Sequence, residues 1–159
     1  MFLDIAYLLD ESILAIQPFI DLEAQHYLQT LQEALKETLP ALPRETRIYG
    51  ICIGDVNSSN FHINDKKVIT LFDFDQCGYA YRAFEIGKFF SSIHSIENKH
   101  DITQAFIDGY QNIRRLNQEE LMAIPYFEII SIIWVMAIHA YNANRIGYKL
   151  LEKHSGTNA

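Results

Sequence analysis

The chain has 159 residues, 49% of them hydrophobic and 13% aromatic, which predicts one folded domain over residues 1–159 rather than a disordered chain. Its formal net charge of −7 argues against a nucleic-acid surface, because nucleic-acid-binding domains are usually basic. Cys52 and Cys77 are too few for a disulfide scaffold, so a reducing compartment is expected.

The sequence predicts neither a secretory signal nor a membrane span. Residues 1–4 (MFLD) lack the basic start of a signal peptide, and acidic residues interrupt the apolar run that follows. The most apolar stretch, residues 129–138, has ten residues, whereas a helix needs about 20 to cross a bilayer. These features predict a soluble cytoplasmic protein without membrane contact.

The first part of the chain predicts two helices. Residues 6–16 form the first, which ends near Pro18 because the residue before a proline disfavours helical conformation. Asp21 is suited to cap the second helix, whose apolar residues recur at helical spacing until Pro40 and Pro43 end it. A short linker then leads into a strand.

Residues 49–75 predict a compact strand, loop and hairpin unit. The strand covers residues 49–53, and a tight polar loop follows at 54–60. The hairpin turns at residues 64–67 and returns along a second strand at 68–72. This order brings the loop and the end of the second strand to the same end of the unit.

Four polar residues are expected at that end. Asp55 and Asn60 lie five residues apart in the loop, where a turn can direct both side chains into one pocket. Asp73 and Asp75 follow the second strand. Carboxylate and amide oxygens are the ligands that Mg²⁺ prefers and the groups that phosphoryl transfer uses.

The rest of the chain predicts helices, which together cover residues 80–152. One is a core helix over residues 80–94, and the next is an amphipathic helix over residues 98–112. Asn117 caps a long helix that runs towards Gly147, with a kink or a helix–helix junction at Pro125 and a frayed tail after it. The fold class is therefore mainly α with a small β-hairpin unit (α+β).

Two segments carry a resemblance to a known superfamily. Residues 53–60 (IGDVNSSN) resemble the H-G-D-x-H-x-x-N catalytic loop of aminoglycoside phosphotransferase and choline kinase-like proteins, and residues 72–75 (FDFD) resemble the metal motif that follows it. Residues 72–90 (FDFDQCGYAYRAFEIGKFF) are most similar to the branch that includes homoserine kinase type II-like proteins. The resemblance runs over residues 8–142 and covers only the C-terminal lobe of such a kinase.

The resemblance implies a role for each polar residue of the two motifs. Asp55 would act as the catalytic base that accepts the proton of the acceptor hydroxyl. Asn60 and Asp73 would bind Mg²⁺ together with ATP, and Ser58 is a candidate contact to phosphate. Asp75 would either touch a second metal or cap the following turn.

The match has three departures within the motifs. Ile53 and Asn57 stand where the superfamily has histidines, which weakens the prediction of activity more than that of the fold. Glu85 stands where relatives carry an aspartate that braces the catalytic loop, so a supporting structural role is expected for it. Further along, Trp134 and two polar neighbours, His139 and Asn142, are weaker candidates for acceptor contacts.

The match also lacks a nucleotide-covering lobe. A complete kinase of this type has a glycine-rich loop over the phosphates and a strand lysine that pairs with them. Residues 1–48 contain no glycine, and Lys36 lies on the polar face of a predicted helix. The resemblance therefore implies a kinase-like C-terminal lobe without its N-terminal lobe.

Three interpretations follow. The first is the C-terminal lobe of an ATP- and Mg²⁺-dependent phosphotransferase that acts on a hydroxyl of an amino alcohol, sugar or aminoglycoside-like acceptor, and is inactive or very slow alone. The second is a non-catalytic binding or assembly module, a homodimer formed through the apolar surface left by the missing lobe. The third is a fragment whose N-lobe partner is encoded upstream.

Overall fold

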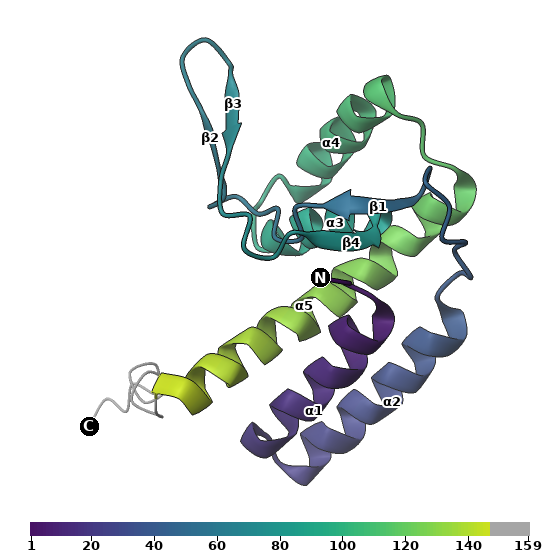
Figure 1. Cartoon of the computed structure of the whole chain (residues 1–159), viewed down its shortest axis with the longest axis vertical. Helices are drawn as coiled ribbons and strands as arrows, with labels where there is room; N and C mark the ends of the chain where they lie inside the picture. The colour runs from purple at the N-terminus through teal and green to yellow at the C-terminus, as the bar shows by residue number, and fades with distance from the viewer. Residues whose placement is uncertain (147–159) are drawn as a thin grey trace.

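The computed structural model describes residues 1–146, with side chains up to residue 143 (Figure 1). This part of the chain is mostly helical and carries two antiparallel sheets of two strands each. The predicted end of the last helix, between Gly147 and residue 152, and the predicted frayed tail lie outside the described residues. The mainly α character with a small β unit is confirmed.

The N-terminal helices agree with the sequence pattern. A π-helical turn, Ala6–Glu11, continues directly into α1, Ser12–Ile16, so helical structure covers the predicted range. After a short 3-10 turn, α2 spans Leu22–Thr38, and the carboxylate of Asp21 accepts the backbone N–H of Ala24 at 2.8 Å. The predicted N-cap is thus confirmed.

The strands form two separate ladders. β1 (Tyr49–Cys52) pairs antiparallel with β4 (Gly78–Tyr81), and β2 (Phe61–Ile63) pairs antiparallel with β3 (Ile69–Leu71). The hairpin turn lies at residues 64–67, as predicted.

β4 corrects the prediction that a helix begins at residue 80. Gly78 and Ala80 are buried while Tyr79 between them is exposed, which is the alternation of a half-buried strand. Tyr79 also bridges to Phe2 of the N-terminal segment. Both pairing partners of β4 are distant in sequence, so the local helical pattern did not reveal this strand.

Three helices complete the described fold: α3 (Arg82–Ser92), α4 (Lys99–Ile113) and α5 (Gln118–Ile146). The α5 N-terminus is a reciprocal capping box, in which Asn117 Oδ1 accepts the N–H of Glu120 at 2.7 Å and Glu120 Oε2 accepts the N–H of Asn117 at 3.0 Å. α5 runs through Pro125 as one helix, so the alternative of a helix–helix junction there is wrong.

The core lies where α3 packs against α5, beneath the β1–β4 sheet (Figure 1). Phe84 of α3 contacts Phe127 and Trp134 of α5 edge-on, with ring centroids 6.1 and 6.0 Å apart. A Cβ at Gly87 would lie 2.7 Å from the backbone nitrogen of Glu128, so a glycine is required where these helices meet. Trp134 is 2% exposed and belongs to this core rather than to an acceptor site.

The apolar part of α5 is longer than the ten-residue stretch, residues 129–138, on which the sequence prediction was based. Gln118–Ala143 is long and apolar enough to cross a membrane by length and composition alone. However, the same helix packs against α3 and α1, and 44% of its most apolar window is buried in the protein. Core helices of soluble proteins share these properties, so α5 is weak evidence for a membrane span.

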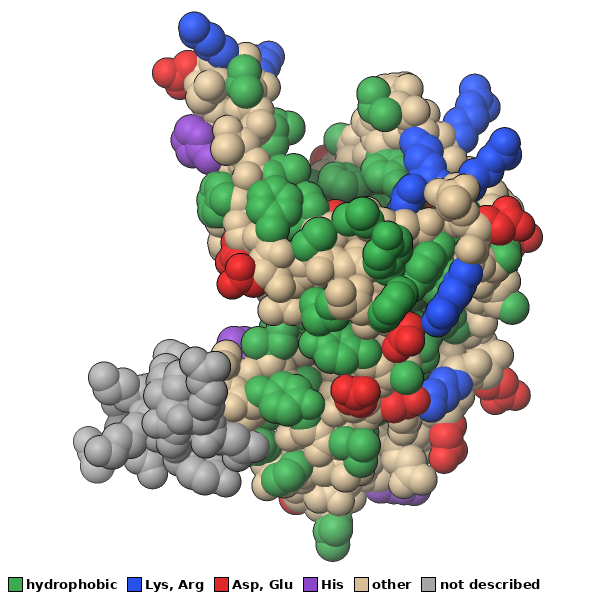
Figure 2. All heavy atoms as spheres, in the orientation of Figure 1, with side chains coloured by type: hydrophobic (Ala, Val, Ile, Leu, Met, Phe, Trp, Pro, Cys, Tyr) green, Lys and Arg blue, Asp and Glu red, His purple; other side chains and the backbone are tan. Residues whose placement is uncertain are grey.

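The β2–β3 hairpin extends away from the body of the molecule (Figure 1). Its apolar side chains remain accessible: Ile63 is 53% exposed, Ile69 61% and Leu71 43%. Figure 2 shows hydrophobic side chains along this hairpin and at its base. The hairpin thus presents apolar surface that the described part of the chain does not cover.

Candidate functional site

The segment after β1 that resembles the catalytic loop, residues 53–60, is called the catalytic-like loop below. Its second residue is a glycine that no other residue can replace without strain. Gly54 has a φ of +83°, and a Cβ there would lie 2.2 Å from the carbonyl oxygen of Gln76. This close approach joins the loop after β1 to the turn before β4. As a result, Asp55 leaves the sheet at a defined position.

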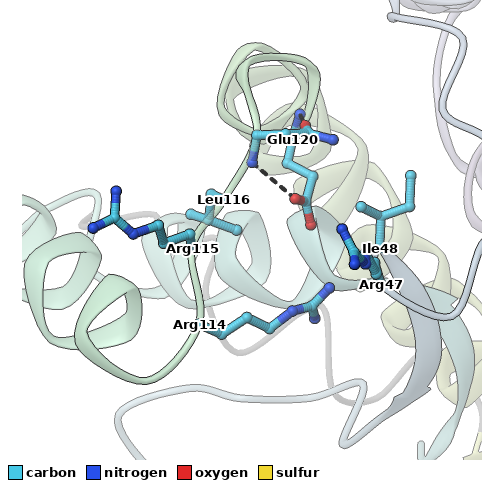
Figure 3. Close-up of a pocket in the computed structure, with 7 residues that line it drawn as sticks. Arg47, Ile48, Arg114, Arg115, Leu116 and Glu120 are labelled. Carbon is cyan, nitrogen blue, oxygen red and sulfur yellow. Dashed lines mark hydrogen bonds between the residues drawn. The ribbon is translucent and has the colours of Figure 1, made fainter.

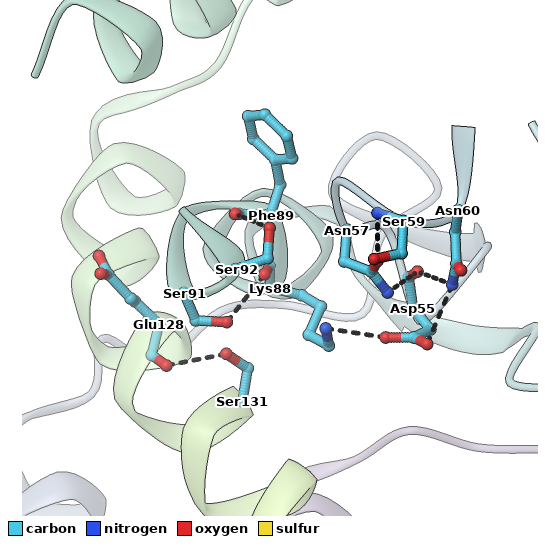
Figure 4. Close-up of polar contacts among 10 residues, drawn as sticks. All are labelled: Asp55, Asn57, Ser59, Asn60, Lys88, Phe89, Ser91, Ser92, Glu128 and Ser131. Carbon is cyan, nitrogen blue, oxygen red and sulfur yellow. Dashed lines mark hydrogen bonds and ion pairs between the residues drawn. The ribbon is translucent and has the colours of Figure 1, made fainter. Parts of the chain in front are cut away.

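Asp55 is held from two sides (Figure 4). Lys88 of α3 forms an ion pair with it, with Nζ 2.8 Å from Oδ1. The Asn60 amide donates to Asp55 Oδ2 at 3.1 Å and to the Asp55 backbone carbonyl at 2.9 Å. Two carboxylate oxygens, each with a defined donor, fix the orientation of this side chain.

The pKa of Asp55 is lowered, although two effects oppose each other. Burial alone would raise the pKa of the carboxyl, since it disfavours the charged form. The hydrogen bond and the charge of Lys88, together with hydrogen bonds from Asn57 and Asn60, outweigh burial and hold the pKa below its ordinary value. Asp55 is therefore a carboxylate at neutral pH.

Lys88 is a site residue that the sequence analysis missed. It is only 4% exposed, and Asp55 is its single ion-pair partner within the described residues. A lysine is almost never buried to this extent without a partner of opposite charge. The one sequence signal was its position between Gly87 and Phe89, in an otherwise apolar stretch of the predicted core helix.

The remainder of the loop is held by its own short-range hydrogen bonds. Asn57 Nδ2 donates to the Asp55 carbonyl at 3.2 Å, and Asn57 Oδ1 accepts the N–H of Ser59 at 2.8 Å. Asn57 thus retains a bonding role at a position where the superfamily has histidine. Ser58 is exposed, and its contact with phosphate stays a prediction.

The second motif is joined to the loop through the backbone. Phe72 N–H donates to the Asn60 carbonyl at 3.1 Å, which brings the next residue, Asp73, beside the loop. Asp73 has a φ of +62°, an uncommon left-handed conformation for a non-glycine residue. Asp73 and Asp75 are both exposed, and whether either binds a metal stays a prediction.

The oxygen atoms of Asn60 and Asp73 suit Mg²⁺ only if a bound ligand supplies further oxygen atoms. Across the described residues, no three His, Cys, Asp or Glu side chains gather to hold a metal by themselves. Asn60 uses its amide nitrogen on Asp55, which leaves its Oδ1 available, and the Asp73 carboxylate is exposed. One amide and one carboxylate oxygen fit the usual Mg²⁺ site, where substrate phosphates and water complete the coordination.

Glu85 lies directly behind the loop. Burial raises the pKa of its carboxyl, and hydrogen bonds from the Cys52 thiol and the Ile53 and Gly54 N–H groups offset only part of that effect. Its Oε2 atom is buried and has no hydrogen-bond partner among the described residues. These contacts agree with the expected role of Glu85 in bracing the loop. Cys52 is buried, whereas Cys77 is exposed.

A cavity of about 430 Å³ separates the hairpin from α4. Ile69 and Leu71 line it on the hairpin side and Phe106 and Tyr110 on the α4 side, with Glu85 at its inner wall. Burial raises the pKa of the Tyr110 hydroxyl. Sequence reasoning did not detect this cavity, because its walls come from separate elements.

The chain belongs to the phosphotransferase enzyme family, whose model matches residues 7–120. This confirms the resemblance to aminoglycoside phosphotransferase-like proteins. Among curated relatives, it is 35% identical over 151 residues to an uncharacterized protein of Synechocystis sp., and 29% identical over 157 residues to one of Deinococcus radiodurans. In both comparisons, the alignment covers 94% of this chain.

Two solved kinases share the fold. The amicoumacin kinase hAmiN, solved in complex with AMP-PNP, Ca²⁺ and Ami, gives a TM-score of 0.66 at 23% identity, covering 83% of this chain and 41% of the kinase. A microcompartment-associated aminopropanol kinase gives 0.71 at 19% identity, covering 86% of this chain and 44% of the kinase. The chain likewise spans only 42% and 45% of the two curated relatives.

Proposed function

We propose that residues 1–159 form a single domain, the C-terminal lobe of a cytoplasmic ATP- and Mg²⁺-dependent phosphotransferase that acts on a hydroxyl group of a small molecule. Family membership supports phosphotransferase chemistry. The arrangement of Asp55, Asn60 and Lys88 is the observation that carries the proposal, because it presents an ionised, oriented carboxylate beside an amide oxygen suited to a metal.

In this proposal, Asp55 accepts the hydrogen bond of the acceptor hydroxyl and then its proton. The Lys88 ion pair keeps Asp55 ionised and oriented, so the acceptor oxygen can be placed in line with the transferred phosphorus. Asn60 and Asp73 would hold Mg²⁺, which when bound offsets the charge of the nucleotide phosphates. Ser58 would contact phosphate, and Asp75 would support a second metal or the turn.

The chain by itself is proposed to be inactive or very slow. Phosphoryl transfer depends on positioning and electrostatics, and the chain spans less than half of its relatives. The exposed apolar residues of the hairpin, such as Ile69, are suited to receive an N-terminal lobe that covers the nucleotide. The acceptor class proposed is an amino alcohol, a sugar or an aminoglycoside-like compound.

The test is calorimetric titration of the 159-residue chain with ATP, with and without Mg²⁺. We expect weak binding that requires Mg²⁺ and is lost in Asp73→Asn. The matched control is Asp65→Asn, which removes an exposed carboxylate from the turn of the same hairpin and should leave binding unchanged. Binding that is unaffected by Asp73→Asn would contradict the proposed metal role, and phosphotransfer by the isolated chain would contradict the proposed inactivity.

A second candidate function is favoured by the exposed hairpin alone: a non-catalytic module that forms homodimers. Ile63, Ile69 and Leu71 are each more than 40% exposed on one hairpin, and contiguous apolar surface of this kind favours association. Light scattering over a concentration series tests it. A dimer that dissociates in the Ile69→Thr/Leu71→Thr variant would support this function, whereas a monomer at high concentration would exclude it.

A further inference from the structure

A second cavity lies at the opposite end of β1 from the catalytic-like loop. It has a volume of about 440 Å³ and is lined by the approach to β1, the turn between α4 and α5, and the first turn of α5. Ile48 belongs to its wall, whereas Ile53 begins the loop at the other end of the strand. A strand of this length spans roughly 13 Å, so the two sites are separate.

Three arginines line this cavity: Arg47, Arg114 and Arg115. Figure 3 shows the guanidinium groups of Arg47 and Arg114 directed toward the side chain of Glu120, while the Arg115 side chain points away from it. Over residues 1–143, the ion pairs use other cations and none of these three. In a chain with a net charge of −7, three arginines around a single carboxylate are a local exception.

Two buried polar atoms of the wall have no partner. Arg114 Nη1 and Glu120 Oε1 are both buried, and neither forms a hydrogen bond with any residue that the structure describes. Glu120 is 2% exposed, and its other oxygen accepts the N–H of Asn117 in the capping box at 3.0 Å. While Oε2 holds the cap, Oε1 stays on the side of the carboxylate that the guanidinium groups of Arg47 and Arg114 face (Figure 3). Buried polar groups without partners are rare and costly, which indicates that something else satisfies them.

The unpaired guanidinium and carboxylate groups indicate which chemical groups a ligand of this cavity should carry. Guanidinium N–H groups bind phosphate oxygens with matched geometry, whereas a carboxylate oxygen accepts an N–H or O–H group. The volume suits a small molecule and lies within the ordinary range of ligand sites. We propose that this cavity binds a small phosphomonoester that carries an ammonium or hydroxyl group, with Arg47 and Arg114 on the phosphate and Glu120 on the donor group.

This proposal is independent of the catalytic one and is tested in the absence of Mg²⁺. The 159-residue chain is titrated with O-phosphoethanolamine, with inorganic phosphate and with ethanolamine, by calorimetry or by NMR. We expect saturable binding of O-phosphoethanolamine, at least tenfold tighter than that of phosphate. Arg114→Gln should weaken both at least tenfold.

Glu120→Gln separates the two halves of the site. Glutamine retains the capping box, so the fold is preserved, but the negative charge is lost. This variant should keep phosphate binding and lose the preference for O-phosphoethanolamine. If Arg114→Gln fails to fold, the double variant Arg47→Gln/Arg115→Gln can replace it, because it changes only exposed side chains. This double variant should also weaken the binding of both O-phosphoethanolamine and phosphate.

The following results would contradict the proposal or assign the anion to another site. Arg44→Gln removes an exposed arginine outside the cavity and should leave binding unchanged. Binding that is lost in Asp73→Asn and kept in Arg114→Gln would assign the anion to the catalytic-like site instead. Absence of saturable binding up to about 10 mM would show that the arginines are only a solvated surface.

Discussion

The catalytic-like loop and the β2–β3 hairpin are two halves of one candidate site, yet the chain supports them very differently. Asp55 is fixed by the buried Lys88 and by Asn60, and Gly54 anchors its loop against a neighbouring turn. On the hairpin, by contrast, Ile69 is 61% exposed. The catalytic-like loop therefore rests on the core of this chain, whereas the hairpin is open to further contacts. Variants of the loop should change stability, and variants of the hairpin should change binding alone.

The largest effect is expected at the anchor of the loop. Gly54→Ala combines a left-handed backbone with a Cβ that would lie 2.2 Å from the Gln76 carbonyl, so the free energy of unfolding should fall by about 4 kcal/mol. Urea unfolding measures this. The matched control is Gly109→Ala on α4, where a Cβ meets nothing within 4 Å and helix propensity should raise stability by about 0.5–1 kcal/mol. Equal stability of both variants would contradict the anchor.

A somewhat smaller loss is expected from breaking the buried ion pair. Asp55→Asn leaves Lys88 buried and charged without a counter-charge, which should lower the free energy of unfolding by about 3 kcal/mol. Adding Lys88→Met removes the unpaired charge and should restore roughly half of that loss. Simple additivity of the two substitutions in a double-mutant cycle would show that the pair is not coupled.

The same ion pair predicts a pH dependence. Because the pKa of Asp55 is lowered on folding, its contribution to stability is complete above the ordinary aspartate pKa and is lost as the pH falls through the folded pKa. In Lys88→Met the main lowering cause disappears and burial raises the pKa instead. Between about pH 6 and about pH 3, the wild-type chain should thus lose more stability than the variant. Parallel unfolding curves against pH would contradict this.

The smallest effect is expected on the hairpin. Ile69→Thr keeps a β-branched residue on an exposed strand and should change the free energy of unfolding by less than about 0.5 kcal/mol. Ile130→Thr makes the same chemical change at a fully buried position of α5 and should cost about 2–3 kcal/mol. A large decrease in the free energy of unfolding of Ile69→Thr would mean that the hairpin contributes to the core. It would contradict the conclusion that only the loop is supported by the core.

Features that depend on nearby residues were predicted correctly from the sequence. The Asp21 cap, the Asn117 cap and the hairpin turn at residues 64–67 each involve groups within four positions of one another. β4 was missed because its partners, β1 and the N-terminal segment, lie far away along the chain. Periodicity reports the conformation that a segment favours by itself, and strand pairing overrides that preference.

The sequence alone determined the family, the helical character and the order of the motif residues, because motif spacing and hydrophobic period are local properties. Only the tertiary structure decided which charge meets Asp55, since Lys88 reaches it from a helix that follows both motifs. It likewise decided that Arg47 and Arg114 share a cavity, and that the described part of the chain leaves the hairpin exposed. Long-range packing brings these groups together, and no local pattern encodes it.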